Sequence, residues 1–211
     1  GVVSSKIADF QTQHPDVRID QTYAYAADLT QRLRSGTLDL ALCPLAPDAV
    51  PQGCLFRPLM AGRNVIACRR GHPLTLKKSL ARTDIGDFAW ISPPADSPLF
   101  SDLKQVLASI GIADFKISFS GGSLNSVLNM TSGSDALTVL PHSVVFAMRA
   151  QFKVEALGIR IDHPRRDLGI LTVEDAAITP AVRRFGAHIE KAFQSLEATM
   201  AHVEQKAIWR A

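Results

Sequence analysis

The pattern of apolar residues in the first fifth of the chain constrains the fold more than any other feature of the sequence. Residues 2–10 place apolar side chains on one helical face, and this helix must end before His14-Pro15. Residues 17–25 alternate as a strand does, residues 28–35 have helical spacing, and residues 38–42 form a short apolar strand. This order of helix, strand, helix and strand predicts βαβ units and a mostly parallel sheet.

The same alternation continues through the rest of the chain. Further strands are expected at residues 55–59, 64–68, 88–92, 115–119, 136–140, 154–157 and 168–173. Further helices are expected at residues 99–110 and 123–131, with Pro141 as the first helical residue of another, and after Thr179-Pro180. The stretches 64–70 and 162–169 are the expected crossings between two lobes. The sequence therefore predicts a first lobe from residues 1–66 and 168–211, and a second lobe from residues 67–167.

Composition excludes several classes of protein. The net charge of +3 is by itself too small to indicate nucleic-acid binding. No apolar stretch approaches the roughly 20 residues of a membrane helix, so no membrane partner is expected. Three cysteines without short pair spacing argue against a disulfide scaffold and a structural zinc site. One local bias, residues 63–82, holds basic residues and no acid. This bias is either a solvated basic face or a contact for an anionic ligand or partner.

The sequence contains no arrangement typical of an active site. His14, His72 and His163 each precede a proline, which places them in loops or at the ends of elements. The Gly-x-Ser-x-Gly pattern is absent, and the run 121–123 lacks the Lys-Ser/Thr end of a phosphate loop. No cluster of His, Cys, Asp or Glu has metal-ligand spacing. We therefore expect no catalytic residue, no metal and no cofactor.

Short motifs along almost the whole chain resemble one family, the LysR-type transcriptional regulators, in their effector-binding domain. It is their order and spacing, rather than any single motif, that carries the resemblance. The motifs are Phe10 with His14-Pro15-Asp16-Val17; Leu29, Leu33, Gly36 and Leu38-Asp39-Leu40-Ala41; Pro58-Leu59; His72-Pro73-Leu74; Ala89-Trp90-Ile91; Ser123 through Leu140-Pro141; and Thr179-Pro180-Ala181-Val182 with Phe185.

The resemblance implies an α/β, type-2 periplasmic-binding-protein-like fold, in which two Rossmann-like lobes are joined by two crossover strands and enclose a ligand cleft. It implies a cytoplasmic sensor whose small-molecule effector alters the geometry of a homodimer or tetramer and so controls transcription. DNA would be bound only through an N-terminal helix-turn-helix that these residues do not contain. Because Gly1 already falls within the first helix, we expect the natural protein to extend upstream, with a further strand.

Candidate effector-binding residues lie where strands end and helices begin, because free N–H groups at helix N-termini attract anionic or polar ligands. They are Tyr25, Ala26, Cys43, Pro44, Ser92, Pro93, Pro94, Ser97, Gly122, Ser123, Leu124 and Asn125. An alternative interpretation is structural: Ser97 and Ser123 only cap helices, and the two prolines only shape a turn.

Three other functions remain open at this point. A periplasmic solute-binding protein of a transporter shares the fold, although unpaired cysteines are unusual in an oxidising compartment. A bilobal enzyme would need a catalytic residue that the sequence does not offer. Oxidant sensing would use Cys43 and Cys54, for which ordinary buried thiols are the simpler interpretation.

Overall fold

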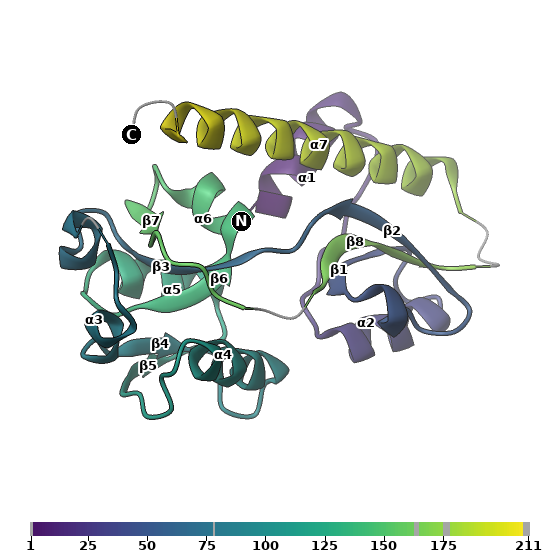
Figure 1. Ribbon diagram of the computed structural model, residues 1–211. Helices are drawn as coiled ribbons and strands as arrows, with labels where there is room; N and C mark the ends of the chain where they lie inside the picture. Colours follow the sequence, from purple (N-terminus) through teal and green to yellow (C-terminus); the bar gives the residue numbers. More distant parts are fainter. Residues whose placement is uncertain (1, 78, 163–164, 175–177, 209–211) are drawn as a thin grey trace. The chain divides into compact units, whose positions relative to one another are not determined.

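The computed structural model describes residues 2–77, 79–162, 165–174 and 178–208. The chain forms two compact units (Figure 1). Unit 1 comprises Gly1–Val2 and Arg63–Pro164, and unit 2 comprises Val3–Gly62 and Arg165–Ala211. The chain therefore passes from one unit to the other near residues 62–63 and again near 164–165. No helix in the described ranges has the length and apolar character needed to cross a membrane.

Unit 2 is built around a three-stranded antiparallel sheet in the order β1-β8-β2. Its elements are α1 (Val2–Gln13), α2 (Ala26–Arg34), β1 (Ala41–Leu45), the 3-10 turn η1 (Pro47–Ala49), β2 (Cys54–Met60), β8 (Asp167–Val173) and α7 (Pro180–Ile208). Leu29 and Leu33 of α2 pack against the sheet residue Leu171. Phe10 of α1 lies edge-on to Phe185 of α7, with 5.2 Å between ring centroids.

Unit 1 contains a second antiparallel sheet in the order β6-β3-β7, and a parallel pair, β4-β5. Its elements are β3 (Asn64–Arg69), the 3-10 turn η2 (Pro73–Leu76), α3 (Arg82–Gly86), β4 (Trp90–Ser92), α4 (Pro98–Ser109), β5 (Ile117–Ser120), α5 (Leu124–Ser132), β6 (Thr138–Pro141), α6 (His142–Met148) and β7 (Val154–Ala156). Trp90 is fully buried in the main core, and Leu107 of α4 belongs to the same cluster. Figure 1 shows α4 running beside the β4-β5 pair.

The strand expected at residues 17–25 is wrong. These residues form no regular element and belong to none of the described sheets, and Tyr23 is 80% exposed. An alternating pattern makes a strand only where a neighbour completes the ladder and covers one face. The strand expected at 38–42 instead begins at Ala41. The N–H of Leu38 donates to the carbonyl of Arg32 (3.2 Å), so the end of α2 uses a donor that a strand would need.

The expected mostly parallel sheet is also wrong for the described strands. Only the β4-β5 pair and one isolated bridge, Trp90 to Leu137, are parallel. β8 enters between β1 and β2, and β3 enters between β6 and β7, each running against both neighbours. In both sheets, the central strand is distant in sequence from at least one of its neighbours. Whether such strands pair parallel or antiparallel depends on the path of the chain between them, which local periodicity does not show.

Most of the remaining elements are confirmed within a few residues, with one local correction at Pro141. This proline ends β6 and precedes α6, whereas it was expected as the first helical residue. The N–H of His142 donates to the carbonyl of Arg63 at 2.7 Å, so the sheet connection extends to the start of the helix. Thr179 behaves as expected for a capping residue, because its hydroxyl oxygen accepts the N–H of Val182 at 3.3 Å.

Candidate functional site

The end of the parallel β4-β5 pair in unit 1 brings two loops together. Ser92 and Ser120 are ladder partners at the carboxyl ends of the two strands. The N–H of Gly121 donates to the carbonyl of Ser92 at 3.1 Å, and the Ser120 hydroxyl donates to the carbonyl of Pro93 at 3.1 Å. Loop 92–97 then leads into α4, and loop 121–123 leads into α5. Ligands of α/β proteins bind at such carboxyl ends, beside helix N-termini.

Two serines of the first loop have buried hydroxyl groups that no described residue satisfies. Ser92 is 1% exposed and Ser97 is 5% exposed, and neither Oγ atom has a hydrogen-bond partner within the described ranges. Ser97 occupies the N-cap position of α4 with extended backbone angles, followed by Pro98 at the first helical position. Its side chain makes no capping hydrogen bond, so the capping interpretation of Ser97 is wrong. A buried hydroxyl without a partner costs free energy, which a bound molecule can recover.

The second loop continues the same edge. A Cβ atom at Gly121 would lie 2.6 Å from the ring of Phe119, so a larger residue here would require that ring to move. A Cβ atom at Gly122 would lie 3.7 Å from Pro94, which shows that the two loops touch. Ser123 is the N-cap residue of α5 without a side-chain capping bond, so for this serine too the capping interpretation is wrong. Leu124 and Asn125, in the first turn of α5, are exposed.

The family to which the chain belongs follows from comparison with known proteins. The family model for the LysR substrate binding domain matches residues 2–194. The chain belongs to this family. Its fold is accordingly the type-2 periplasmic-binding-protein-like α/β fold, and its function is that of the effector-binding domain of a LysR-type transcriptional regulator. The interpretation as a transporter's solute-binding protein is not favoured.

Individual relatives agree with this assignment. The chain is 25% identical over 179 residues to the HTH-type transcriptional regulator GbpR of Azospirillum brasilense, covering 84% of this chain and 52% of GbpR. The chain spans about half the length of the curated relatives it matches. Among solved structures it is similar to the effector-binding domain of QuiR in complex with shikimate, with a TM-score of 0.65, 20% identity and coverage of 93% and 90%. It is also similar to the CcmR regulatory domain of Synechocystis PCC6803 in complex with 2-PG, with a TM-score of 0.69, 16% identity and coverage of 92% and 90%.

The other candidate residues of this LysR-type domain belong to unit 2. Tyr25 and Ala26 lie at the N-terminus of α2, where Tyr25 is 44% exposed and its side chain makes no capping bond. Pro44 is an exposed residue of β1. Cys43 lies in the core of the unit beside Leu33, and burial raises the pKa of its thiol to about 11. Its thiol therefore stays protonated at neutral pH.

The three cysteines are free and buried. Cys43 lies opposite Gly169 on one side of β8, and Cys54 lies opposite Val173 on the other side. Two strand spacings already separate them by about 10 Å, and the offset along β8 adds to this. A disulfide needs Cα atoms within about 7 Å, so a bond between these two cysteines would require the sheet to break.

Trp90 lies in the strand predicted at residues 88–92, but it was not among the candidate residues. The ring is fully buried, and Nε1 has no hydrogen-bond partner among the described residues. Because a buried tryptophan N–H normally has a partner, a tryptophan in a predicted strand was the signal that could have directed attention to this position. Trp90 precedes Ser92 on β4, which places three unsatisfied buried groups, on Trp90, Ser92 and Ser97, within eight residues. The part of the chain that the structure describes holds no cluster of three potential metal ligands.

Proposed function

We propose that this domain holds a small polar or anionic effector at the carboxyl end of the β4-β5 pair. The observation that carries the proposal is the pair of buried hydroxyls of Ser92 and Ser97, which have no hydrogen-bond partner among the described residues. Ser92 ends β4, Ser97 is the N-cap residue of α4, and loop 121–123 brings the N-terminus of α5 to the same edge. Helix N-termini and hydroxyl donors together favour negative oxygen atoms.

The residues at the carboxyl end of the β4-β5 pair are suited to binding a ligand rather than to catalysing a reaction. A nucleophilic serine needs a general base within hydrogen-bond reach. Neither Ser92 nor Ser97 has such a neighbour among the described residues. The acidic residue of the first loop, Asp96, is exposed. We infer that the domain recognises its ligand and releases it unchanged.

At the level of the whole regulator, we propose that effector binding changes the geometry of a homodimer or tetramer. DNA would be contacted by a helix-turn-helix segment outside this sequence, and the protein would act in the cytoplasm. Support comes from the HTH-type regulators GbpR and GalR, of whose length this chain matches about half. An effector shifts such an equilibrium only through different affinities for the two arrangements.

The effector site is tested by a binding screen with matched serine variants. Shikimate and 2-PG are the first probes, followed by small carboxylates and phosphates, with calorimetry as the readout. For any ligand that binds, Ser92→Ala and Ser97→Ala should each weaken the affinity about tenfold, because each removes a hydrogen bond to a charged group. Ser101→Ala is the control, since Ser101 is an exposed residue of α4. Equal affinity in all three variants would place the ligand elsewhere and overturn the proposal.

A further inference from the structure

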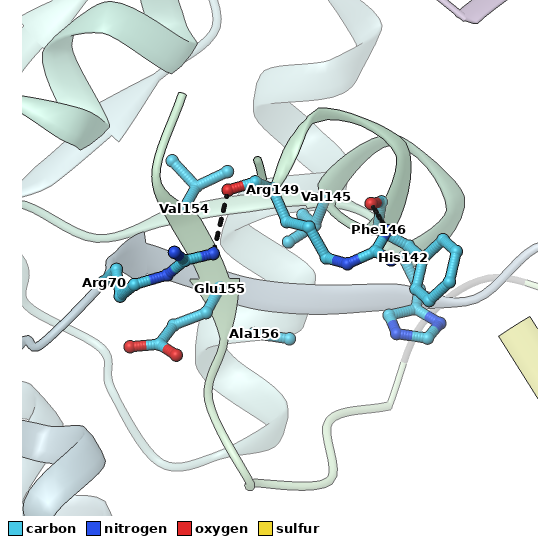
Figure 2. A pocket seen from close by; sticks show the side chains of 8 residues that line it. All are labelled: Arg70, His142, Val145, Phe146, Arg149, Val154, Glu155 and Ala156. Atoms are coloured by element: carbon cyan, nitrogen blue, oxygen red, sulfur yellow. Dashed lines mark hydrogen bonds between the residues drawn. The ribbon is translucent and has the colours of Figure 1, made fainter. Parts of the chain in front are cut away.

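A cavity in unit 1 is lined by residues that do not belong to the β4-β5 edge (Figure 2). It has a volume of about 170 Å³ and lies between the end of β3, helix α6 and strand β7. Its lining residues are Arg70, His142, Val145, Phe146, Arg149, Val154, Glu155 and Ala156. None of them belongs to the candidate effector residues.

Two guanidinium groups at this cavity lack a carboxylate partner. Arg70 donates from Nη2 to the carbonyl of Arg149 at 3.3 Å, as Figure 2 shows. Arg149 donates to the carbonyl of Phe146, and its guanidinium carbon lies 3.7 Å from the centroid of the Phe146 ring. Within the described ranges, neither arginine forms an ion pair. Each guanidinium carries five N–H donors in a planar fork that suits a carboxylate, so most of the donors on both side chains remain available.

The carboxylate of Glu155 also lines the cavity and opposes an anion there. One of its oxygen atoms, Oε1, accepts the N–H of Gly71 at 2.9 Å, which holds the group toward the turn after β3. Two guanidiniums against one carboxylate leave an excess of one positive charge. The site therefore attracts one negative charge rather than two.

The remaining wall is apolar. Val145, Phe146 and Val154 are buried, and Ala156 is partly buried. A fully hydrated inorganic anion would lose water against this wall without compensation, whereas an apolar group would be stabilised there. We propose that this cavity is a second ligand site, which binds a small monocarboxylate with a compact apolar body, its carboxylate toward Arg70 and Arg149.

Two other basic residues near Arg70 in the sequence form ion pairs, whereas Arg70 forms none among the described residues. In the basic stretch 63–82, Arg69 pairs with Asp135 at 2.6 Å, and Lys77 pairs with Asp84 at 2.6 Å. Lys78 lies outside the described residues. The stretch therefore contains both a solvated, internally paired face and, at Arg70, a cation available to a ligand.

The experiment is an NMR titration of the isotopically labelled chain with sodium pivalate, whose tert-butyl group is compact and apolar. Saturable shifts of backbone amides in α6 and β7 are expected. Pivalamide has the same shape without the charge, and it should give no saturable shift. Arg70→Gln and Arg149→Gln should each weaken pivalate binding at least about fivefold, because each removes a charge-assisted hydrogen bond. Arg160→Gln is the control, since Arg160 is an exposed arginine of the same unit.

The proposal would be overturned by the lack of a saturable shift in α6 and β7, by equal binding of pivalamide, or by inorganic phosphate binding as tightly as pivalate. If Arg149→Gln fails to fold, Arg70→Gln decides alone, because Arg70 is exposed and its side chain donates only one described hydrogen bond. Ser97→Ala should leave pivalate binding unchanged. A loss of pivalate binding in Ser97→Ala would mean that the probe occupies the β4-β5 edge, and the second-site proposal would fail while the effector proposal stood.

Discussion

Two loops of unit 1 enter helical turns through the same local pattern, a polar residue followed by Pro-Leu. His72 precedes Pro73 at the start of η2, and Ser97 precedes Pro98 at the start of α4. Both N-cap residues have extended backbone angles, and both are buried, at 0% and 5% exposure. They differ in what their side chains bind. His72 accepts the N–H of Leu74 on Nδ1 at 3.1 Å, whereas Ser97 accepts nothing from the described residues.

The difference separates a structural polar residue from one available to a ligand. Because Nδ1 of His72 accepts, Nε2 carries the proton and donates to the carbonyl of Asp135 at 3.1 Å. Both ring nitrogens are therefore satisfied by protein, and the ring also packs against Phe88 at 4.6 Å between centroids. The His-Pro-Leu motif thus stabilises the fold of unit 1. Ser97 has the same backbone geometry with its hydroxyl unsatisfied, as expected where a molecule from outside completes the site.

The largest expected effect comes from removing the histidine. His72→Ala should lower the free energy of unfolding by about 2–4 kcal/mol, because it leaves a cavity and removes the hydrogen-bond partner of the buried N–H of Leu74 and of the carbonyl of Asp135. Urea unfolding followed by circular dichroism measures this. His202→Gln is the control, since His202 is an exposed residue of α7. A loss below about 1 kcal/mol would show that the motif is not structural.

Cys43 extends the comparison to a buried thiol. Its thiol pKa is raised from about 9 to about 11 in the folded chain, so the unfolded chain loses the proton first. The contribution of the protonated Cys43 thiol to the free energy of unfolding is therefore fully present below pH 9, and it is lost as the pH rises toward 11. When the pH is raised from 8 to 11, the free energy of unfolding should fall in both proteins. The fall should be about 1–2 kcal/mol smaller in Cys43→Ala than in the parent chain. Parallel losses in the two proteins would contradict the assigned burial of the thiol.

Replacing Ser97 tests whether it caps α4. An N-cap serine normally loses about 1 kcal/mol on substitution by alanine. Because its hydroxyl makes no described bond, Ser97→Ala should keep the free energy of unfolding within about 0.5 kcal/mol of the parent, or raise it. Thr179→Ala is the matched variant, since Thr179 also precedes a proline but accepts the N–H of Val182. It should lose about 1 kcal/mol. Equal losses of stability in Ser97→Ala and Thr179→Ala would show that the two hydroxyls contribute alike, and the contrast between these N-cap residues would be wrong.

The smallest effect concerns the two prolines. Pro73→Ala and Pro98→Ala should each lower the free energy of unfolding by about 0.5 kcal/mol, because both prolines restrict the unfolded chain in the same way. Thermal unfolding of the two variants side by side measures the difference. Unequal losses would mean that the backbone of the two loops differs, and the contrast between His72 and Ser97 would then lose its basis.

Much of the fold could be predicted from the sequence. Apolar spacing located α4 and α5 to within a few residues, because a helix records its buried face in its own periodicity. The same reasoning failed at residues 17–25, where alternation was present without a neighbouring strand. Of the candidate site, the loop positions were predictable because strand ends and helix starts are local features. The proximity of the two loops at Pro94 and Gly122 could not be predicted, because it depends on the pairing of β4 with β5.

The sequence by itself therefore determined which segments are helices and strands, which faces are apolar and which family the motifs resemble. These properties follow from interactions between residues a few positions apart. Only the tertiary structure decided which buried polar groups are satisfied. His72 finds its partner at Asp135, 63 residues away, and Arg69 finds the side chain of the same residue. The Ser97 hydroxyl has no hydrogen-bond partner among the described residues, and the Arg70 guanidinium reaches the carbonyl of Arg149 but no described carboxylate.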